Sequence, residues 1–372
     1  MKKSLIALAV LAAFGTAHAQ STATISGKFG VAVGKGFGSD ANVHVSDGNV
    51  TVAAVEDLGG GLKAGVSIDM RTRGREQNVA TATGQEIGRD ATVYVSGGFG
   101  TVSMGSIEAG NGIMGLGLGG AQQSLASGWD GNLLAGVSYA NLMQWTSPSI
   151  SGFNVSLTHI DSAGTVGVTT TKAATSAGAP ITVNTDTGIS AQQIGATYNN
   201  GPISVSADFA AFSNNTSSTS TSNRSRIRAS ASYDLGVMKI GAGVEDNKGK
   251  VYQSTSSSTQ STNADYAGNQ LIIGASVPVG PLLLGAAYAR NTENGILVGD
   301  TSNGDETAKG WLVSANYSLS KRTTVLGTYS DIKRSGGAYS SSGVSGTTTA
   351  VNTTAHTTNS GAQFRIRLMH SF

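Results

Sequence analysis

The sequence predicts an all-β fold, a transmembrane antiparallel β-barrel of about sixteen strands. The clearest segment lies between Leu62 and Arg71, where Leu62 and Val66 fall on one face and Lys63 and Asp69 on the other. Successive side chains of a strand point to opposite faces, so this strand has one apolar and one charged face. Similar segments recur along the chain, at about 22–34, 48–57, 61–71, 88–97, 99–106, 135–146, 152–161, 189–199, 202–212, 225–234, 236–246, 266–278, 281–291, 309–319, 322–333 and 359–372.

The connections between these segments alternate between short and long. The long ones are rich in Ser, Thr, Asn and Gly, and both chain ends fall on the short-turn side, as in an even-stranded outer-membrane barrel. A soluble sandwich has no reason to keep all its long loops at one end, whereas closure leaves no unpaired edge in lipid. The expected long loops are 35–47, 72–87, 107–134, 162–188, 213–224, 247–265, 292–308 and 334–358.

The first nineteen residues have the pattern of a secretory signal. Lys2 and Lys3 precede an apolar segment, and Ala17-His18-Ala19 is a small-x-small cleavage site, so residues 1–19 are excluded from the barrel, which is expected over 20–372. The two lysines account for the formal charge of +2, so the remaining chain is nominally neutral and nucleic acid is not an expected partner.

Two absences in the composition restrict how the protein crosses a membrane. Cysteine is absent, so an exported chain must be held by packing or by a closed hydrogen-bond network. No apolar run after the signal approaches the roughly 18–20 residues of a helical span. Any crossing must therefore be made by strands.

The C-terminal strand shows the same division between faces. Phe364, Ile366 and Phe372 share one parity, and Arg365 and Arg367 hold the other. This pattern fits lipid on one side and a wet lumen on the other. Aromatic residues near the ends of other strands fit interfacial girdles, namely Tyr139, Trp145, Tyr198, Tyr233, Tyr288, Tyr317 and Tyr329.

Several motifs resemble those of the Gram-negative general porins, especially the β-proteobacterial type. They are Glu56–Ala64 (EDLGGGLKA), Gly98–Gly105, Ser147–Phe153, Leu319–Thr323 and the C-terminal strand ending in Phe372. The resemblance implies a trimeric sixteen-stranded barrel in the outer membrane, in contact with its lipid and lipopolysaccharide. Such a barrel passes ions and small hydrophilic solutes, and Phe372 would be the signal read by the outer-membrane assembly machinery.

The resemblance also implies that the third long loop, 107–134, folds inward to form a constriction. Glu108 and Asp130 in this loop would form its acidic side or, equally, structural salt bridges, and Arg89 would face them. Further charged residues have lumen parity: Lys63, Asp69, Arg71, Arg226, Arg228, Arg365 and Arg367. Arginines of many relatives are replaced by Asn49, Ser106 and Ser138, so strong anion selectivity is not predicted.

Two other kinds of function remain open from the sequence. A surface adhesion barrel would use the Thr-rich loops 162–188 and 334–358 to bind host or matrix. An enzyme would need a site such as one around His159 and Asp161, but sequence proximity alone is weak support for a catalytic triad. The histidines lack metal-ligand spacing and the glycine run 115–120 lacks a βαβ context, so no metal or cofactor is expected.

Overall fold

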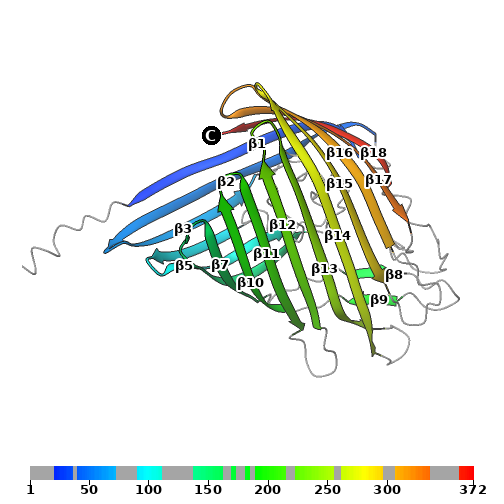
Figure 1. Ribbon diagram of the computed structural model, residues 1–372, viewed down its shortest axis with the longest axis horizontal. Helices are drawn as coiled ribbons and strands as arrows, with labels where there is room; N and C mark the ends of the chain where they lie inside the picture. Colours follow the sequence, from blue (N-terminus) through cyan, green and yellow to red (C-terminus); the bar gives the residue numbers. More distant parts are fainter. Residues whose placement is uncertain are drawn as a thin grey trace, which may run out of the picture.

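The computed structural model describes residues 21–36, 40–72, 90–110, 137–161, 169–172, 181–184, 189–214, 223–254, 261–295, 306–335 and 360–372 of the chain. Sixteen antiparallel strands close into a barrel (Figure 1), which confirms the predicted fold class. They are β1 (Thr22–Lys35), β2 (Asn42–Gly59), β3 (Leu62–Arg71), β4 (Asp90–Gly97), β5 (Gly100–Gly110), β6 (Val137–Thr146), β7 (Phe153–Asp161), β10 (Ile189–Asn200), β11 (Ile203–Asn214), β12 (Asn223–Asp234), β13 (Lys239–Ser254), β14 (Ser261–Val279), β15 (Leu282–Gly295), β16 (Glu306–Ser318), β17 (Thr323–Ser335) and β18 (Gly361–Ser371).

Several element boundaries differ from the sequence prediction, and β13 (to Ser254) and β14 (from Ser261) both extend into the expected loop 247–265. β2 begins at Asn42, inside the expected loop 35–47, and β5 runs on to Gly110 because its ladder with β6 continues past Ile107. The expected loop 162–188 contains a separate two-stranded sheet, β8 (Thr169–Lys172) with β9 (Ile181–Asn184). Loops of polar composition can thus hold ladder pairs that apolar alternation does not reveal.

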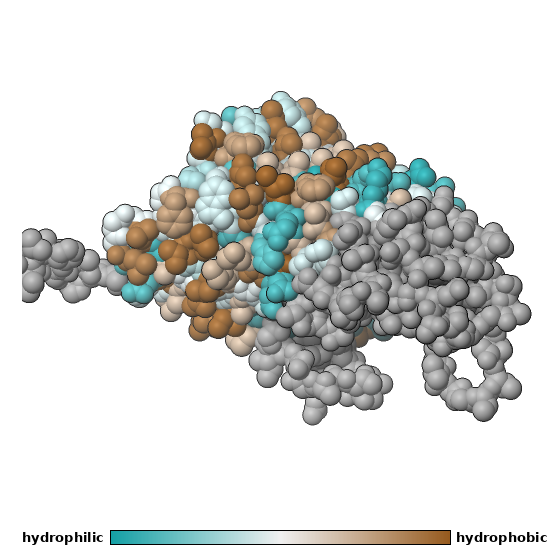
Figure 2. Space-filling model, turned by 90° about the horizontal axis from the view of Figure 1, so that it is seen from below, coloured by the Kyte–Doolittle hydropathy of each residue, from teal (hydrophilic) through white to brown (hydrophobic). Residues whose placement is uncertain are grey.

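The outer face of the barrel is apolar and exposed. Along β18, Ile366 is 56% and Leu368 52% exposed, while Arg365 between the neighbouring apolar positions is buried. Figure 2 shows hydrophobic side chains spread over the visible part of the described wall. So large an exposed apolar surface marks a face that meets lipid or another protein. Among the described residues, no helix is long and apolar enough to cross a membrane.

Aromatic side chains lie on this outer face near both ends of the strands. Trp311 and Tyr329 contact each other on the loop side of β16 and β17, with ring centroids 5.5 Å apart. Tyr233 and Tyr317 lie near the short turns and are also exposed. Aromatic rings concentrate where hydrocarbon meets water, so these two belts mark the interfaces of the membrane.

The barrel closes where β1 pairs with β18. The terminal Phe372 and Gly27 exchange two backbone hydrogen bonds, of 3.0 and 3.1 Å. Gly27 has no room for a side chain: a Cβ there would lie 2.5 Å from the carbonyl oxygen of Asn49 and 2.6 Å from the Phe372 ring. The glycine therefore lets the last residue of the chain complete the ladder.

Gly27→Ala should weaken this seam. The added methyl overlaps both backbone and ring, and overpacking of this kind costs about 1–3 kcal/mol. We expect a lower urea midpoint for unfolding of the refolded barrel in detergent, followed by gel migration. Gly98→Ala is the matched control, because a Cβ at Gly98 meets no atom within 4 Å. Equal midpoints for the two variants would contradict the packing argument.

Candidate functional site

Charged side chains gather on the inner wall in three groups, the first at the closure seam. This seam group consists of Lys28 on β1, Asp47 on β2, and Arg365 and Arg367 on β18. The Asp47 carboxylate lies 3.2 Å from Lys28 Nζ and 2.5 Å from Arg367 Nη1. Lys28 and Arg367 thus share one carboxylate on the walls that β18, β1 and β2 form, and Arg365 lies one inward position further along β18.

Small residues on β1 make the seam group possible. After Lys28, the inward positions on β1 are Gly30, Ala32 and Gly34, and all three are buried. Arg367 lies opposite Ala32, and Asp47 lies opposite Gly30 on the other side. A Cβ on Gly30 would lie 3.4 Å from Asp47 Cβ. Because β1 has no bulky inward side chain here, Arg367 can extend over β1 to reach Asp47 on β2.

The second group lies on β11, β12 and β13. Asp208 accepts a hydrogen bond from Arg228 Nε at 2.8 Å and lies 3.6 Å from Arg226 Nη2, and Glu245 lies 3.9 Å from Arg228 Nε. The Arg226 guanidinium also lies over the Phe212 ring, 5.4 Å from its centroid. Two arginines and two carboxylates compensate each other here, so this wall carries little net charge.

The third group is centred on the buried Asp69 of β3. Its carboxylate accepts hydrogen bonds from Asn49 Nδ2 at 2.8 Å and from Thr51 Oγ1 at 3.0 Å, both on β2. Arg71 lies two residues further along β3, directly opposite Asn49. The structure therefore brings Asp69 and Arg71 together on one wall, with Asn49 as a hydrogen-bond donor between strands.

The other predicted pore residues are more dispersed. Lys63 lies on the inward parity of β3 near the short turns and is exposed. Arg89 and Asp130 lie outside the described residues. Glu108 belongs to β5, and its side chain is not described. Its position in the strand has the same parity as Met104 and Ser106, which is the outward parity and not that of the lumen.

The three positions at which the resemblance implied arginine have different placements. Asn49 faces the lumen and binds Asp69. Ser106 pairs with Ala91 and Asn141, has the same parity as the exposed Met104, and therefore lies on the outer face. The serine at this position consequently removes no charge from the lumen. Ser138 is in β6, and its side chain is not described.

Sequence reasoning missed several members of these groups. Lys28, Asp47 and Glu245 were not predicted to line the pore. Lys28 stands two residues before Gly30 in the alternation of β1, so its inward parity was available from the sequence. Asp47 was assigned to a loop, and its contact with Arg367 joins positions 320 residues apart, for which the sequence carries no signal.

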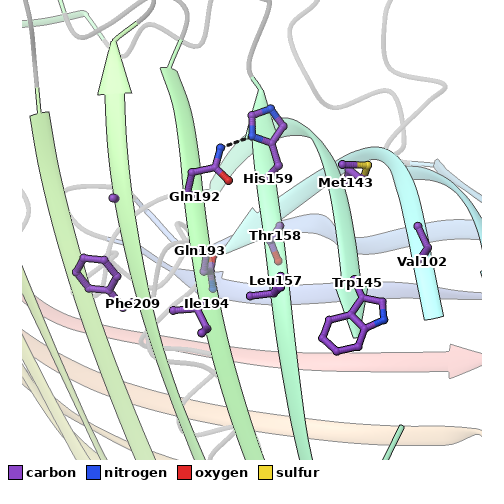
Figure 3. Close-up of a pocket in the computed structure, with 11 residues that line it drawn as sticks. Val102, Met143, Trp145, Leu157, Thr158, His159, Gln192, Gln193, Ile194 and Phe209 are labelled. Atoms are coloured by element: carbon purple, nitrogen blue, oxygen red, sulfur yellow. Dashed lines mark hydrogen bonds between the residues drawn. The ribbon is translucent and has the colours of Figure 1, made fainter. Parts of the chain in front are cut away.

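A shallow groove of about 630 Å³ lies on the outer wall rather than in the lumen. Figure 3 shows Trp145, Leu157 and Ile194 in a row across β6, β7 and β10. On the loop side of that row, His159 Nδ1 and Gln192 Nε2 are 2.5 Å apart. His159 and Asp161 share this outward parity, which places both on the outer wall and outside the pore.

No group of three or more His, Cys, Asp or Glu residues suited to a metal ion occurs within the described part of the chain. The adhesion alternative rests on loops 162–188 and 334–358, most of which lie outside the described residues.

The geometry of the described wall is that of a closed tube with an apolar exterior and a polar, charged interior.

Comparison with known proteins identifies the family. The Gram-negative porin family model matches residues 7–337. Outer membrane porin protein 32 of Delftia acidovorans is 30% identical over 361 residues, covering 90% of each chain.

Solved structures share the fold. The anion-selective porin from Comamonas acidovorans superimposes with a TM-score of 0.62 at 23% identity, covering 95% of this chain and all of that one. A trimer form of the outer-membrane protein OmpT of Vibrio cholerae has a TM-score of 0.61 at 13% identity, covering 95% of this chain and 99% of that one. The chain belongs to the Gram-negative porins, which are diffusion channels of the outer membrane and not enzymes.

Proposed function

We propose that this channel prefers anions weakly and that the seam group sets the preference. The observation that carries the proposal is the excess of charge there: Lys28 and Arg367 share the single carboxylate of Asp47. Ion selectivity in a wide pore comes from charges that line the water, and low-dielectric walls concentrate their field. Arginine keeps its charge at any relevant pH, so the preference should persist across the physiological range.

The other wall groups are less able to set selectivity. The group on β11–β13 is internally compensated, and Asn49 stands where many relatives have an arginine. The solved porin from Comamonas acidovorans is described as anion-selective, which supports the same sign of preference here. Position 49 lies directly opposite Lys28 of the seam group, so the preference proposed here would come from the same part of the wall as that of relatives with arginine at position 49.

We propose further that loop 107–134 folds inward and narrows the channel, with Asp130 among the charges that meet the solute and Arg89 on the facing wall. Support comes from an apolar surface on the inward face of β14–β17. Ile272, Leu312 and Ile332 have inward parity and are at most 1% exposed. Apolar residues are unusual on a wall that faces water, and the leucine-containing glycine run 115–120 of this loop is suited to pack on them.

The distribution of outward aromatics supports a homotrimer. Strands β2–β5 contain one aromatic residue, Tyr94, and it points inward beside Gly65, whereas the outer faces of β10–β18 carry many aromatics. A face without interfacial aromatics suits protein contact better than lipid contact. We therefore assign β2–β5 to the subunit interface, which gel migration before and after heating in mild detergent would test.

The remaining proposals concern delivery and surroundings. Residues 1–19 would be removed as a secretory signal, leaving 20–372 as the barrel. The outward and exposed Phe372 would be read by the assembly machinery, and the outer wall would contact lipid and lipopolysaccharide.

The charge proposal predicts the sign of the reversal potential in a planar bilayer under a KCl gradient. The current through the unmodified channel should reverse at a potential shifted toward the equilibrium potential of chloride. Removing the cations in Lys28→Gln/Arg367→Gln should move the reversal potential toward zero, whereas Asp47→Asn should move it further to the chloride side. Lys239→Gln, near the short turns, is the control and should change little. A potassium-side potential for the unmodified channel would refute the proposal.

The constriction proposal predicts that deleting residues 113–131 raises single-channel conductance. This deletion leaves the ladder between β5 and β6 intact, since its last pair is Gly110 and Val137. An equal-length deletion of 340–358 in the last long loop serves as control and should leave conductance nearly unchanged. Unchanged conductance in the first deletion would show that loop 107–134 does not narrow the pore.

The assembly proposal predicts a difference between cells and detergent for Phe372→Asp. Assembly into the outer membrane of living cells should fall sharply, because the recognised aromatic end is lost. Ser371→Asp adds the same charge at the neighbouring inward position and should assemble better. Both variants should be refolded in detergent as a separate measure of stability. Normal membrane levels of Phe372→Asp would exclude this role.

A further inference from the structure

Three cations form a continuous row on the outer face of the barrel at its loop end. Arg290 on β15 lies directly opposite Lys309 on β16, and Lys309 lies directly opposite Lys333 on β17. All three are exposed, and the inward residues beside them, Ala289 and Ala308, are buried. We call these residues the outer cation row. Neighbouring strands are about 4.8 Å apart, so the row spans roughly 10 Å of wall.

The row costs stability unless something compensates it. Like charges directly opposite each other on a sheet are destabilising. Among the described carboxylates, Asp331 is the one nearest in register, two residues before Lys333 on the same face of β17, and no ion pair joins it to the row. By contrast, Lys248 on the outer face of β13 is neutralised by Asp246 at 2.7 Å. Within the part of the chain that the structure describes, the row is therefore a positive site without a carboxylate partner.

The aromatic belt fixes the depth of this site in the membrane. Tyr288 lies opposite Trp311 one step toward the membrane from the row, and Trp311 contacts Tyr329. Rings at this position lie at the headgroup level of the outer leaflet. The cations lie immediately beyond them, one outward position closer to the long loops on β15, β16 and β17. Thr307 and Ser335, opposite each other one step further out, add hydroxyl groups.

We propose that the outer cation row binds the phosphate groups of a phosphorylated glycolipid of the outer leaflet. The inference rests on the proposed contact of the wall with lipopolysaccharide and names the site. Lysine and arginine near a membrane surface are each worth about 1 kcal/mol toward anionic lipid. A row of three can bridge two phosphates on one headgroup, with the acyl chains lying against the apolar wall below Trp311.

Binding should be measured by titrating the refolded barrel in neutral detergent with diphosphorylated lipid A, dephosphorylated lipid A and inorganic phosphate. The unmodified barrel should bind the diphosphorylated lipid much more tightly than the dephosphorylated one. Arg290→Ser/Lys309→Ser/Lys333→Ser should weaken binding roughly a hundredfold. Lys248→Ser should bind like the unmodified barrel, and Asp331→Asn should bind more tightly.

Single-channel conductance of the same samples separates the outcomes. Unchanged conductance in the triple variant would show that its barrel is intact, whereas the absence of channels in the unmodified protein would count against the pore and not against the row. Equal lipid affinity of the triple variant and the unmodified barrel would overturn the proposal. Competition by inorganic phosphate at the same concentration as the lipid would overturn the lipid assignment, because the site would then be a plain phosphate site.

Discussion

The closed backbone ladder is the constraint on which the rest of this structure depends. Lipid offers no hydrogen-bond partners, so every strand must pair on both sides and the last must meet the first. In this chain the final pair is Gly27 with Phe372. Closure fixes the register at the seam, and the register in turn determines that Lys28, Asp47 and Arg367 share one wall. The candidate selectivity group is thus a consequence of how the barrel closes.

Parity then assigns each residue to lipid or to water. Because the period of a strand is two, a charged residue moved by one position changes from the lumen to the membrane face. On β18 this separates Arg365 and Arg367 from Ile366 and Leu368. On β15–β17 the same rule puts Arg290, Lys309 and Lys333 outside, above the aromatic belt, where a cation costs little compared with the bilayer centre.

Most of the fold could be predicted from the sequence because alternation is a local signal. In strands such as Leu62–Arg71 and Ile203–Asn214, alternation alone distinguishes the apolar face from the polar face. The long loops distinguish the loop end of the barrel from the short-turn end. The candidate site was only partly predictable. The inward parity of Arg226, Arg228, Arg365 and Arg367 was readable, but their partners lie on other strands. Ser106 shows the limit of analogy, since its position matched a family arginine while its register places it on the outer face.

Because the chain as a whole is nearly neutral, the local arrangement of charge determines which ions and lipids it attracts. Outside the first nineteen residues the formal charges of Lys, Arg, Asp and Glu balance, so an excess of cations in one place requires an excess of carboxylates in another. Within the described wall the β11–β13 group is balanced, whereas the seam group and the outer cation row are both positive. Under the two proposals, a solute in the channel meets the first excess and the surrounding lipid meets the second. Average charge therefore predicts neither interaction, and the strand register that separates the two excesses determines both.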